Sequence, residues 1–303
     1  MNRERLMRAF TEAAGEAAVR ADEPMSAHTT FRIGGPADFF LEPSGAEEIR
    51  ELLRICGEEG LPYFIMGNGS NLLVSDSGYR GAVIRIGSNM NRIEADGVRV
   101  KAESGAFLSA IASLCASKSL AGFEFAGGIP GSFGGACVMN AGAYGGELKQ
   151  VLVSVTVIDE KREICVLPAG DLELGYRSSI FMERPLIAVS GEIELQPGDP
   201  AEIEAKSADF RSRRISKQPL DLPSAGSTFK RPEGYFAGKL IEDSGLKGYR
   251  VGGAAVSEKH CGFVVNTGGA TAADVRKLID DVKVRVHENF GVTLEPEIRM
   301  LGF

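Results

Sequence analysis

The sequence contains no apolar run that approaches the roughly 18 residues of a membrane-spanning helix. Its first residues, MNRERLMRAFTEAAGEAAV, lack the apolar core of a secretory signal because charged side chains occur throughout. Leu6, Phe10, Ala13, Ala14 and Ala17 recur there at roughly helical spacing, which predicts an amphipathic helix. We therefore expect a cytoplasmic protein without membrane insertion.

The sequence also lacks the ligand spacing of a metal site and an excess of basic residues. The three histidines, His28, His260 and His287, show no metal-ligand spacing with the cysteines. A formal charge of −7 argues against a dedicated nucleic-acid-binding protein, which would have a basic face. The five cysteines are odd in number and widely spaced in apolar segments, which indicates reduced, mostly buried thiols; they are Cys56, Cys115, Cys137, Cys165 and Cys261. Neither metal catalysis nor nucleic-acid binding is expected.

Glycine, by contrast, is concentrated in one stretch. Gly127–Gly146 reads GGIPGSFGGACVMNAGAYGG, and we expect no regular helix or strand where eight of twenty residues are glycine. Glycine suits positions with positive φ or a close approach to the backbone, and free N–H groups in such turns bind phosphate. The alternative is a set of connecting turns without a ligand.

A second glycine-containing run, Gly67-Asn68-Gly69-Ser70-Asn71, follows the strand-like segment Tyr63–Met66. Neither run matches an established nucleotide signature. The first lacks the third glycine of G-x-G-x-x-G, and the second lacks the Gly-Lys-Ser/Thr ending of a P-loop. Two such loops predict a ligand with a long phosphate-bearing body between two parts of the chain, for which a dinucleotide is the simplest candidate.

Hydrophobic periodicity predicts the remaining elements. A capping box at Ser44 opens a helix that glycines 57 and 60 close, and Asp96-Gly97 predicts a hairpin over 92–102. Pro219 and Pro223 predict an extended linker that contains Ser227. Further helices are expected at 107–120, 201–217, 235–244 and from Thr271, and further strands at 82–86, 151–158, 163–167, 186–195, 251–256, 262–266 and 292–301.

The chain length of 303 residues exceeds what one hydrophobic core usually serves, so two or three subdomains are expected. Strands outnumber helices and do not alternate regularly with them, which indicates an α+β fold. We place the subdomains at 1–87, 88–208 and 209–303.

Seven motifs, in the right order, carry a resemblance that covers nearly the whole chain: GNGSNLL at Gly67, the glycine run at Gly127, GYRSSIF at Gly175, SAGSTFKRP at Ser224, AGKLIEDSGLKG at Ala237, GGAAVSEKHCGFVVN at Gly252 and LEPEIRMLG at Leu294. The sequence resembles the UDP-N-acetylenolpyruvoylglucosamine reductase family of peptidoglycan precursor synthesis. Only 49 residues separate Arg177 from Ser227, so it resembles the shorter form without the tyrosine-bearing insertion.

The resemblance implies a two-subdomain FAD-binding fold of the vanillyl-alcohol-oxidase type at 1–87 and 88–208, followed by a C-terminal α+β substrate-binding domain. It also implies non-covalent FAD, NADPH as reductant and a UDP-sugar substrate whose enolpyruvyl ether is reduced to a lactyl ether. The oligomeric state is not implied. Hydride would come from N5 of the reduced flavin, because side chains cannot donate hydride.

Specific residues carry these implied roles. Arg177 and Glu297 would stabilise the enolate, with the Glu297 carboxyl protonated or sharing a proton, and Ser227 would deliver the proton. The implied FAD contacts are Gly67, Asn68, Gly69, Ser70, Asn71, Ile129, Pro130, Gly131, Gly134, Gly135, Asn140, Ala141 and Gly142. The implied UDP-sugar contacts are Tyr144, Arg214, Lys217, Lys239, His260 and Arg299, since a diphosphate needs positive partners in an acidic protein.

Alternatives remain at each level. Arg177 could form a surface ion pair, Glu297 a strand-edge ion pair with Arg299, and Ser227 a turn hydrogen bond. At the level of function, the alternatives are a flavin oxidase of a small alcohol or phenol and a nucleotide-binding regulatory module without catalysis. An oxidase would show fast reoxidation of its flavin by oxygen without a UDP-sugar.

Overall fold

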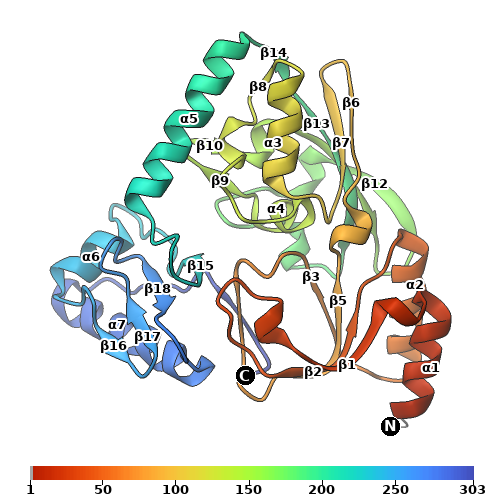
Figure 1. Ribbon diagram of the computed structural model, residues 1–303, viewed down its shortest axis with the longest axis horizontal. Coiled ribbons are helices and arrows are strands. Elements are labelled where there is room, and N and C mark those ends of the chain that lie inside the picture. The colour runs from red at the N-terminus through yellow and green to blue at the C-terminus, as the bar shows by residue number, and fades with distance from the viewer. Residues whose placement is uncertain (1–2) are drawn as a thin grey trace. The chain divides into compact units, whose positions relative to one another are not determined.

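The computed structural model describes residues 3–303, and these form two compact units, each assembled from separate segments of the chain (Figure 1). Unit 1 contains the residues up to Ala21 together with Phe39–Asn68 and Gly81–Arg214. Unit 2 contains Asp22–Asp38, Gly69–Arg80 and Ile215–Phe303.

The first two α-helices of the chain have apolar residues that share a core with strands of a four-stranded sheet, in the order β1-β2-β5-β3. Leu6 and Phe10 of the first helix and Ile49 and Leu52 of the second are buried, as their helical spacing predicts. Phe10 packs edge-to-face on Phe39, with ring centroids 5.3 Å apart. The elements are α1 (Arg3–Ala14), α2 (Ala46–Glu58), β1 (Val19–Pro24), β2 (Pro36–Leu41), β3 (Tyr63–Met66) and β5 (Tyr79–Arg85).

The predicted capping box at Ser44 is wrong, because Gly45 is the residue before the helix and no side chain caps it. Helix α2 begins at Ala46, so Glu48 occupies the third helical position and accepts hydrogen bonds from the backbone N–H and the hydroxyl of Ser44. Glu47 instead pairs with Arg50 at 2.7 Å. The Ser-to-Glu spacing therefore located the start of the helix but not the hydrogen bonds of a capping box.

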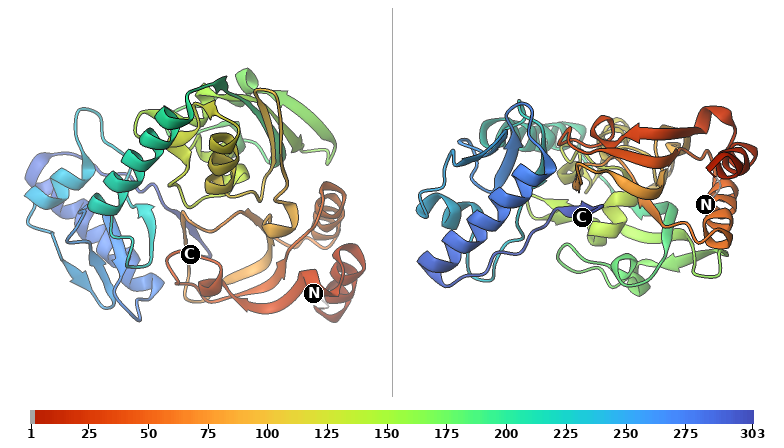
Figure 2. Two further views of the ribbon diagram at one scale, coloured as in Figure 1. Left: turned by 45° about the horizontal axis from the view of Figure 1, so that its top comes forward. Right: turned by 90° about the horizontal axis from the view of Figure 1, so that it is seen from below.

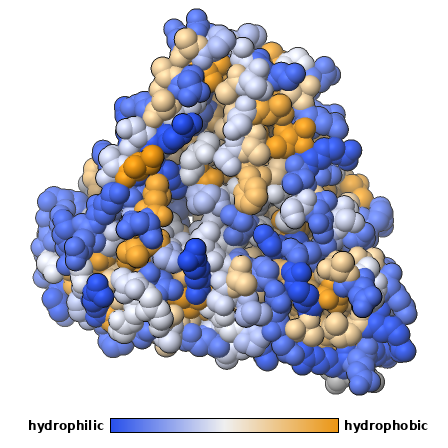
Figure 3. Space-filling model, viewed as in Figure 1, coloured by the Kyte–Doolittle hydropathy of each residue, from blue (hydrophilic) through white to orange (hydrophobic). Residues whose placement is uncertain are grey.

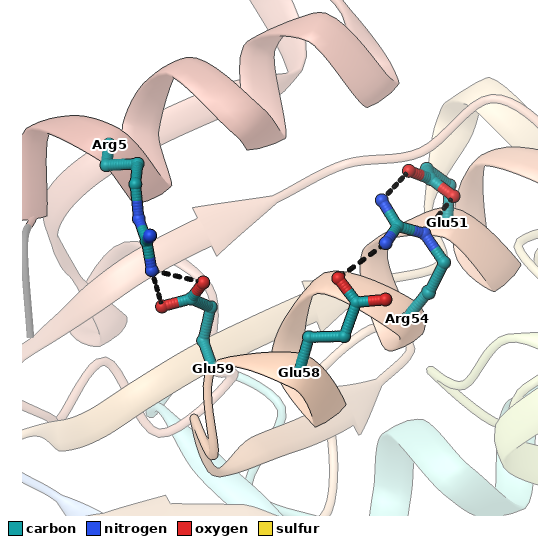
Figure 4. Close-up of polar contacts among 5 residues, drawn as sticks. All are labelled: Arg5, Glu51, Arg54, Glu58 and Glu59. Carbon is teal, nitrogen blue, oxygen red and sulfur yellow. Dashed lines mark hydrogen bonds and ion pairs between the residues drawn. The ribbon is translucent and has the colours of Figure 1, made fainter.

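Ion pairs lie on the surface of these two helices (Figure 4). Arg5 of α1 bonds to Glu59, and Arg54 reaches both Glu51 and Glu58 on its own helix. The hydrogen bond from Arg54 lowers the pKa of the Glu51 carboxyl. Exposed pairs of this kind contribute little to folding, so the apolar contacts beneath them hold the helices in place.

Unit 1 also contains a five-stranded antiparallel sheet, in the order β12-β11-β13-β7-β6. Helices α3 and α4 pack on its strands β6, β7 and β13 (Figure 2). The predicted hairpin is confirmed, because β6 and β7 are antiparallel with Asp96 opposite Arg99. Its elements are β6 (Ile93–Asp96), β7 (Arg99–Glu103), α3 (Leu108–Ser117), α4 (Phe133–Met139), β11 (Leu152–Ile158), β12 (Ile164–Pro168) and β13 (Ile187–Glu194), with the short pair β8 (Leu120–Ala121) and β14 (Gln196–Pro197).

Helix α4 lies inside the glycine run, where no regular helix was expected. Gly134 explains why glycine is needed in a helix here: a Cβ on it would lie only 2.7 Å from the Cβ of Ser104. The helix therefore approaches the neighbouring backbone closely rather than forming a loop. Beyond it, the run continues as the short hairpin of β9 (Gly142–Ala143) and β10 (Gly146–Glu147).

Unit 2 contains the four-stranded sheet β15-β18-β17-β16, with α7 packed on β16 and β17 and α6 packed on α7. Thr271 caps α7 through a capping box with Asp274. The elements are β15 (Ser224–Ser227), α6 (Ala237–Asp243), β16 (Arg250–Val251), β17 (Ala254–Val256), β18 (Phe263–Asn266) and α7 (Ala272–Phe290), with β4 (Leu72–Val74) parallel to β19 (Arg299–Leu301).

Three expectations for unit 2 are wrong in detail. The predicted linker contains strand β15, which pairs with β18 and so satisfies its backbone in a sheet. The predicted strand 251–256 is a hairpin, because Gly252-Gly253 turns the chain between β16 and β17. Only the last three residues of the predicted strand 292–301 form a regular strand, and Pro296 makes an isolated bridge to Phe229. Apolar runs located these segments but not their hydrogen-bond partners.

Helix α5 (Pro200–Lys217) confirms the helix expected at 201–217, and the boundary between the units falls within it. Among residues 3–303, buried apolar side chains form three clusters, two in unit 1 and one in unit 2. Because two clusters share one unit, this division does not decide between two and three subdomains. The boundaries at 87 and 208 stay a prediction.

The cysteines and the surface agree with the composition. Cys56, Cys115, Cys137 and Cys261 are buried free thiols, Cys165 is half-buried, and burial raises the pKa of Cys56 and Cys115 to about 12.

On the face in Figure 3, apolar residues form separate patches among hydrophilic ones. Among residues 3–303, no helix is long and apolar enough to cross a membrane, and no cluster of metal-ligating side chains occurs.

Candidate functional site

Asn140 ties the glycine run to the segment that carries Arg177. Its side chain is 1% exposed, and its amide donates to the Glu147 carboxylate at 3.0 Å and to the Gly175 carbonyl at 2.9 Å. Its carbonyl oxygen accepts from the Lys149 N–H at 3.0 Å. Asn140 also has a positive φ of 40°, which a short amide side chain tolerates. It therefore fixes the shape of this region.

Arg177 occupies a corner of a tight turn, in which Gly175 and Ser178 exchange backbone hydrogen bonds. Its φ of 53° is left-handed, and such a conformation in a non-glycine residue costs on the order of 1–3 kcal/mol. The half-buried guanidinium donates to the Gly142 carbonyl at 3.2 Å and lies 5.5 Å from the Tyr176 ring. A strained backbone that holds a cation against the glycine run is typical of a functional position.

Tyr144 is a second strained residue in the same place. It precedes Gly145 in the two-residue turn between β9 and β10, where both residues have positive φ, 55° and 85°. Turns of this type favour Asn-Gly or Asp-Gly, so tyrosine is poorly suited to the backbone. Its ring stacks on Phe210 of α5, with centroids 4.7 Å apart and planes 10° from parallel.

Arg214 lies against the start of the glycine run. A Cβ on Gly128 would be 3.1 Å from the Arg214 Cδ, so the absence of a side chain there makes room for the arginine. Burial lowers the pKa of Arg214, and Tyr144 acts in the opposite direction. Within residues 3–303 its guanidinium has neither a hydrogen bond nor an ion pair. A desolvated cation without a partner favours an anionic ligand.

Two buried hydroxyls beside the glycine backbone also lack partners. Ser104 and Ser132 are 1% and 3% exposed, and their Oγ atoms make no hydrogen bond within the described part of the chain. A Cβ on Gly67 would overlap Ser132 Oγ, and Asn68 donates to the Pro130 carbonyl at 2.6 Å, so both glycine runs meet here. Unsatisfied buried donors beside glycine backbone fit a phosphate-bearing ligand.

In unit 2, the structure brings Ser227 and Glu297 to adjacent segments. The Glu297 N–H donates to the carbonyl of Thr228, the neighbour of Ser227, at 2.8 Å. Asn71 holds the same segment, since its amide donates to the Glu297 carbonyl at 3.1 Å and its own carbonyl accepts from the Arg299 N–H. Ser227 is half-buried at the end of β15. The Ser227 hydroxyl and the Glu297 carboxyl therefore belong to two neighbouring segments of the backbone.

The other predicted ligand contacts of unit 2 have different surroundings. Lys239 pairs with Asp243 at 2.6 Å, which raises its pKa. His260 is half-buried, and its Nδ1 accepts from the Gly262 N–H at 3.0 Å, so a neutral ring carries its proton on Nε2. Burial lowers the pKa of His260, and nearby Lys217 lowers it further. Neutral His260 is thus a hydrogen-bond donor rather than a cation.

The predicted residues are divided between the units. Unit 1 holds Gly67, Asn68, Ile129, Pro130, Gly131, Gly134, Gly135, Asn140, Ala141, Gly142, Tyr144, Arg177 and Arg214; unit 2 holds Gly69, Ser70, Asn71, Lys217, Ser227, Lys239, His260, Glu297 and Arg299. Ser104, Glu147 and Phe210 were not predicted as site residues, and Ser132 belongs to the predicted glycine run but was not singled out. Phe210 had a visible signal, because it is the one aromatic residue in the polar helix α5.

Two protein families match this chain, one towards its N-terminus and one in its C-terminal third. Residues 37–167 match a family described as an FAD binding domain, and residues 218–301 match the UDP-N-acetylenolpyruvoylglucosamine reductase C-terminal domain. A UDP-N-acetylenolpyruvoylglucosamine reductase of Clostridium perfringens is 54% identical over 94% of this chain and 93% of its own length. One from Alkaliphilus oremlandii is 49% identical and covers 100% of this chain and 99% of its own.

Two solved structures are similar to the chain, the first in sequence and fold and the second in fold alone. The UDP-N-acetylenolpyruvylglucosamine reductase of Thermus caldophilus has a TM-score of 0.81 and 33% identity, and the match covers 93% of this chain and 99% of that one. A 4-ethylphenol oxidase from Gulosibacter chungangensis, 17% identical, has a TM-score of 0.51 over 97% of this chain and 64% of its own. The expected α+β architecture, with an FAD-binding fold of the oxidase type and a C-terminal domain, is confirmed.

Proposed function

Because the chain belongs to the UDP-N-acetylenolpyruvoylglucosamine reductase family, we propose that it reduces UDP-N-acetylglucosamine-enolpyruvate to UDP-N-acetylmuramate with NADPH as electron donor. It is an FAD-dependent oxidoreductase of peptidoglycan precursor synthesis. Its proposed location is the cytoplasm. NADPH oxidation that depends on the enolpyruvyl sugar tests the proposal, and NADPH oxidation indifferent to that sugar would contradict it.

The observation that carries the proposed mechanism is the placement of the motif residues. Arg177 is held by a strained turn against the glycine run, and Ser227 and Glu297 lie on hydrogen-bonded neighbouring segments. Cations, hydroxyls and carboxyls in such fixed positions suit the reduction of an enol ether, which needs charge stabilisation and a proton.

The residues of unit 1 fit FAD. Buried Ser104 and Ser132 offer unsatisfied hydroxyls beside the glycine backbones of Gly67 and Gly134, and we propose that this region holds the pyrophosphate. Asn140–Gly142 would lie against the flavin. When bound there, FAD would supply hydride for the β-carbon of the enolpyruvyl group.

Arg177 is proposed to bind the substrate carboxylate. As hydride arrives at the β-carbon, negative charge grows on that carboxylate, and a fixed guanidinium stabilises it. The positive φ and the bond to Gly142 hold the guanidinium in advance, so little reorganisation is needed at the moment of reaction. Glu297 is proposed to assist in a protonated or proton-sharing form.

Ser227 is proposed to deliver the proton to the α-carbon. A serine hydroxyl is a weak acid, so it needs a neighbouring cation or a proton relay. Lys217, Lys230 and Lys239 of the same unit are candidates for the cation. Tyr144, Arg214, Lys217, Lys239, His260 and Arg299 are proposed contacts of the UDP-sugar.

Gly67→Ala tests the FAD contact without relying on activity. The new methyl group would overlap Ser132 Oγ and displace that hydroxyl, so we expect a lower flavin content after purification and weaker FAD binding in titrations. Gly170→Ala is the matched control, because a Cβ there meets nothing within 4 Å. Equal flavin affinity in both variants would contradict the assignment of Ser132 to the FAD site.

A further inference from the structure

Helix α5 contacts the glycine run through one face. Only Ile203 of its eighteen residues is buried, so the helix is not held by a broad apolar surface. Lys206, Phe210 and Arg214 recur at intervals of four residues and therefore share one face. Figure 1 shows α5 beside the β9–β10 hairpin.

Two of these three residues contact the glycine run, and Lys206 contacts the segment just before it. Lys206 Nζ lies 3.2 Å from the carboxylate of Glu124, which is buried and three residues before Gly127. Phe210 stacks on Tyr144, and Arg214 lies against Gly128. The first two side chains thus have protein partners, whereas Arg214 has none within residues 3–303.

The Tyr144–Phe210 stack compensates for an unfavourable backbone. Tyr144 occupies a turn position that favours asparagine, aspartate or glycine, and its ring is 38% exposed. Its hydroxyl has no hydrogen-bond partner within the described chain, although the residue interacts electrostatically with Arg214. A tyrosine kept in a strained turn, with a fixed ring and an unoccupied hydroxyl, is suited to contact a ligand.

We propose that Phe210 is a positioning residue, which acts through Tyr144 on the binding of the nucleotide sugar. Stacking fixes the plane of the Tyr144 ring, so its hydroxyl is held near the Arg214 guanidinium before the anionic substrate arrives. This inference rests on the proposed function, since it takes the UDP-sugar as the ligand. It gives α5 a role in substrate binding, although Phe210 itself need not touch the substrate.

The test is a double-mutant cycle with Phe210→Ala and Tyr144→Ala, measured as the dissociation constant of UDP-N-acetylglucosamine-enolpyruvate for the oxidised, FAD-loaded protein. Phe210→Ala alone should weaken binding by roughly 2- to 12-fold, the range expected for an aromatic pair. When Tyr144 is already alanine, Phe210→Ala should not change the dissociation constant further. Phe210→Trp, which keeps a flat ring, should restore wild-type affinity.

Phe290→Ala is the matched control, because Phe290 is 41% exposed at the end of α7 and makes no ring stack in the described chain. The Phe290→Ala variant should bind the enolpyruvyl sugar with wild-type affinity. The flavin content of all variants should equal that of the wild type. Unchanged affinity in Phe210→Ala, or an equal loss with and without Tyr144, would overturn the inference. Neither result would affect the proposed function, which fails only if the wild-type protein does not reduce the sugar.

Discussion

Ser227→Ala is expected to leave flavin reduction by NADPH intact and to slow reduction of the enolpyruvyl sugar by about 10²- to 10⁴-fold, the contribution of a general acid. The reason is that only the second half-reaction requires a proton at the α-carbon. The effect should therefore appear in kcat for the overall reaction, with the affinity for the sugar largely preserved.

The substitution is not expected to disturb folding. Ser227 is half-buried at the end of β15, where its backbone pairs with Phe263 of β18, and the substitution removes a single oxygen. Ser224→Ala is the matched control at the other end of the same strand. Ser227→Cys should retain part of the activity because a thiol gives up its proton more readily than a hydroxyl.

The measurement is single-turnover mixing. Protein reduced anaerobically with NADPH is mixed with the sugar in deuterated water, and flavin reoxidation is followed together with deuterium at the α-carbon of the product. Wild-type rates for both signals in Ser227→Ala would assign the proton to another residue and return Ser227 to a turn or strand hydroxyl.

Arg177→Lys is expected to lower kcat by about 10²- to 10³-fold, the loss typical of removing one preorganised donor to a developing negative charge. Lysine keeps the charge but not the forked geometry that binds a carboxylate through two parallel hydrogen bonds. Both side chains impose the same strain at a φ of 53°, so the stability of the fold should change little.

Arg211→Lys on the exposed side of α5 is the control for this substitution, and its kcat should equal that of the wild type. Thermal unfolding of both variants separates a chemical effect from a structural one. If Arg177→Lys kept kcat within about twofold of the wild type, Arg177 would be a structural residue whose bond to Gly142 shapes the turn rather than the reaction.

Periodicity predicted most of the helices and strands, because their buried stripes arise from local sequence. The positions of α1, α2, α5, α7 and the β6–β7 hairpin followed from apolar spacing, capping residues and Asp96-Gly97. Helix α4 did not, since glycine disfavours helices locally and only its contact with Ser104 explains its use. Strand β15 required a partner that lies far away in the sequence.

The candidate site shows the same division between local and long-range information. Motifs pointed to Arg177, Ser227 and Glu297, but the left-handed turn at Arg177 and the bond between the Glu297 and Thr228 backbones come only from the three-dimensional structure. Ser132 and Phe210 lie beside residues that the motifs did identify. Their significance depends on an unsatisfied hydroxyl and on a ring stack, which no local pattern records.

A single turnover of the wild-type protein without oxygen tests directly whether its flavin reduces the enolpyruvyl sugar. NADPH should bleach the flavin absorption, and adding one equivalent of UDP-N-acetylglucosamine-enolpyruvate should restore it with formation of one equivalent of UDP-N-acetylmuramate. Oxygen alone should restore the absorption slowly. A flavin that stays reduced in the presence of the sugar and is rapidly reoxidised by oxygen would contradict the account and indicate an oxidase instead.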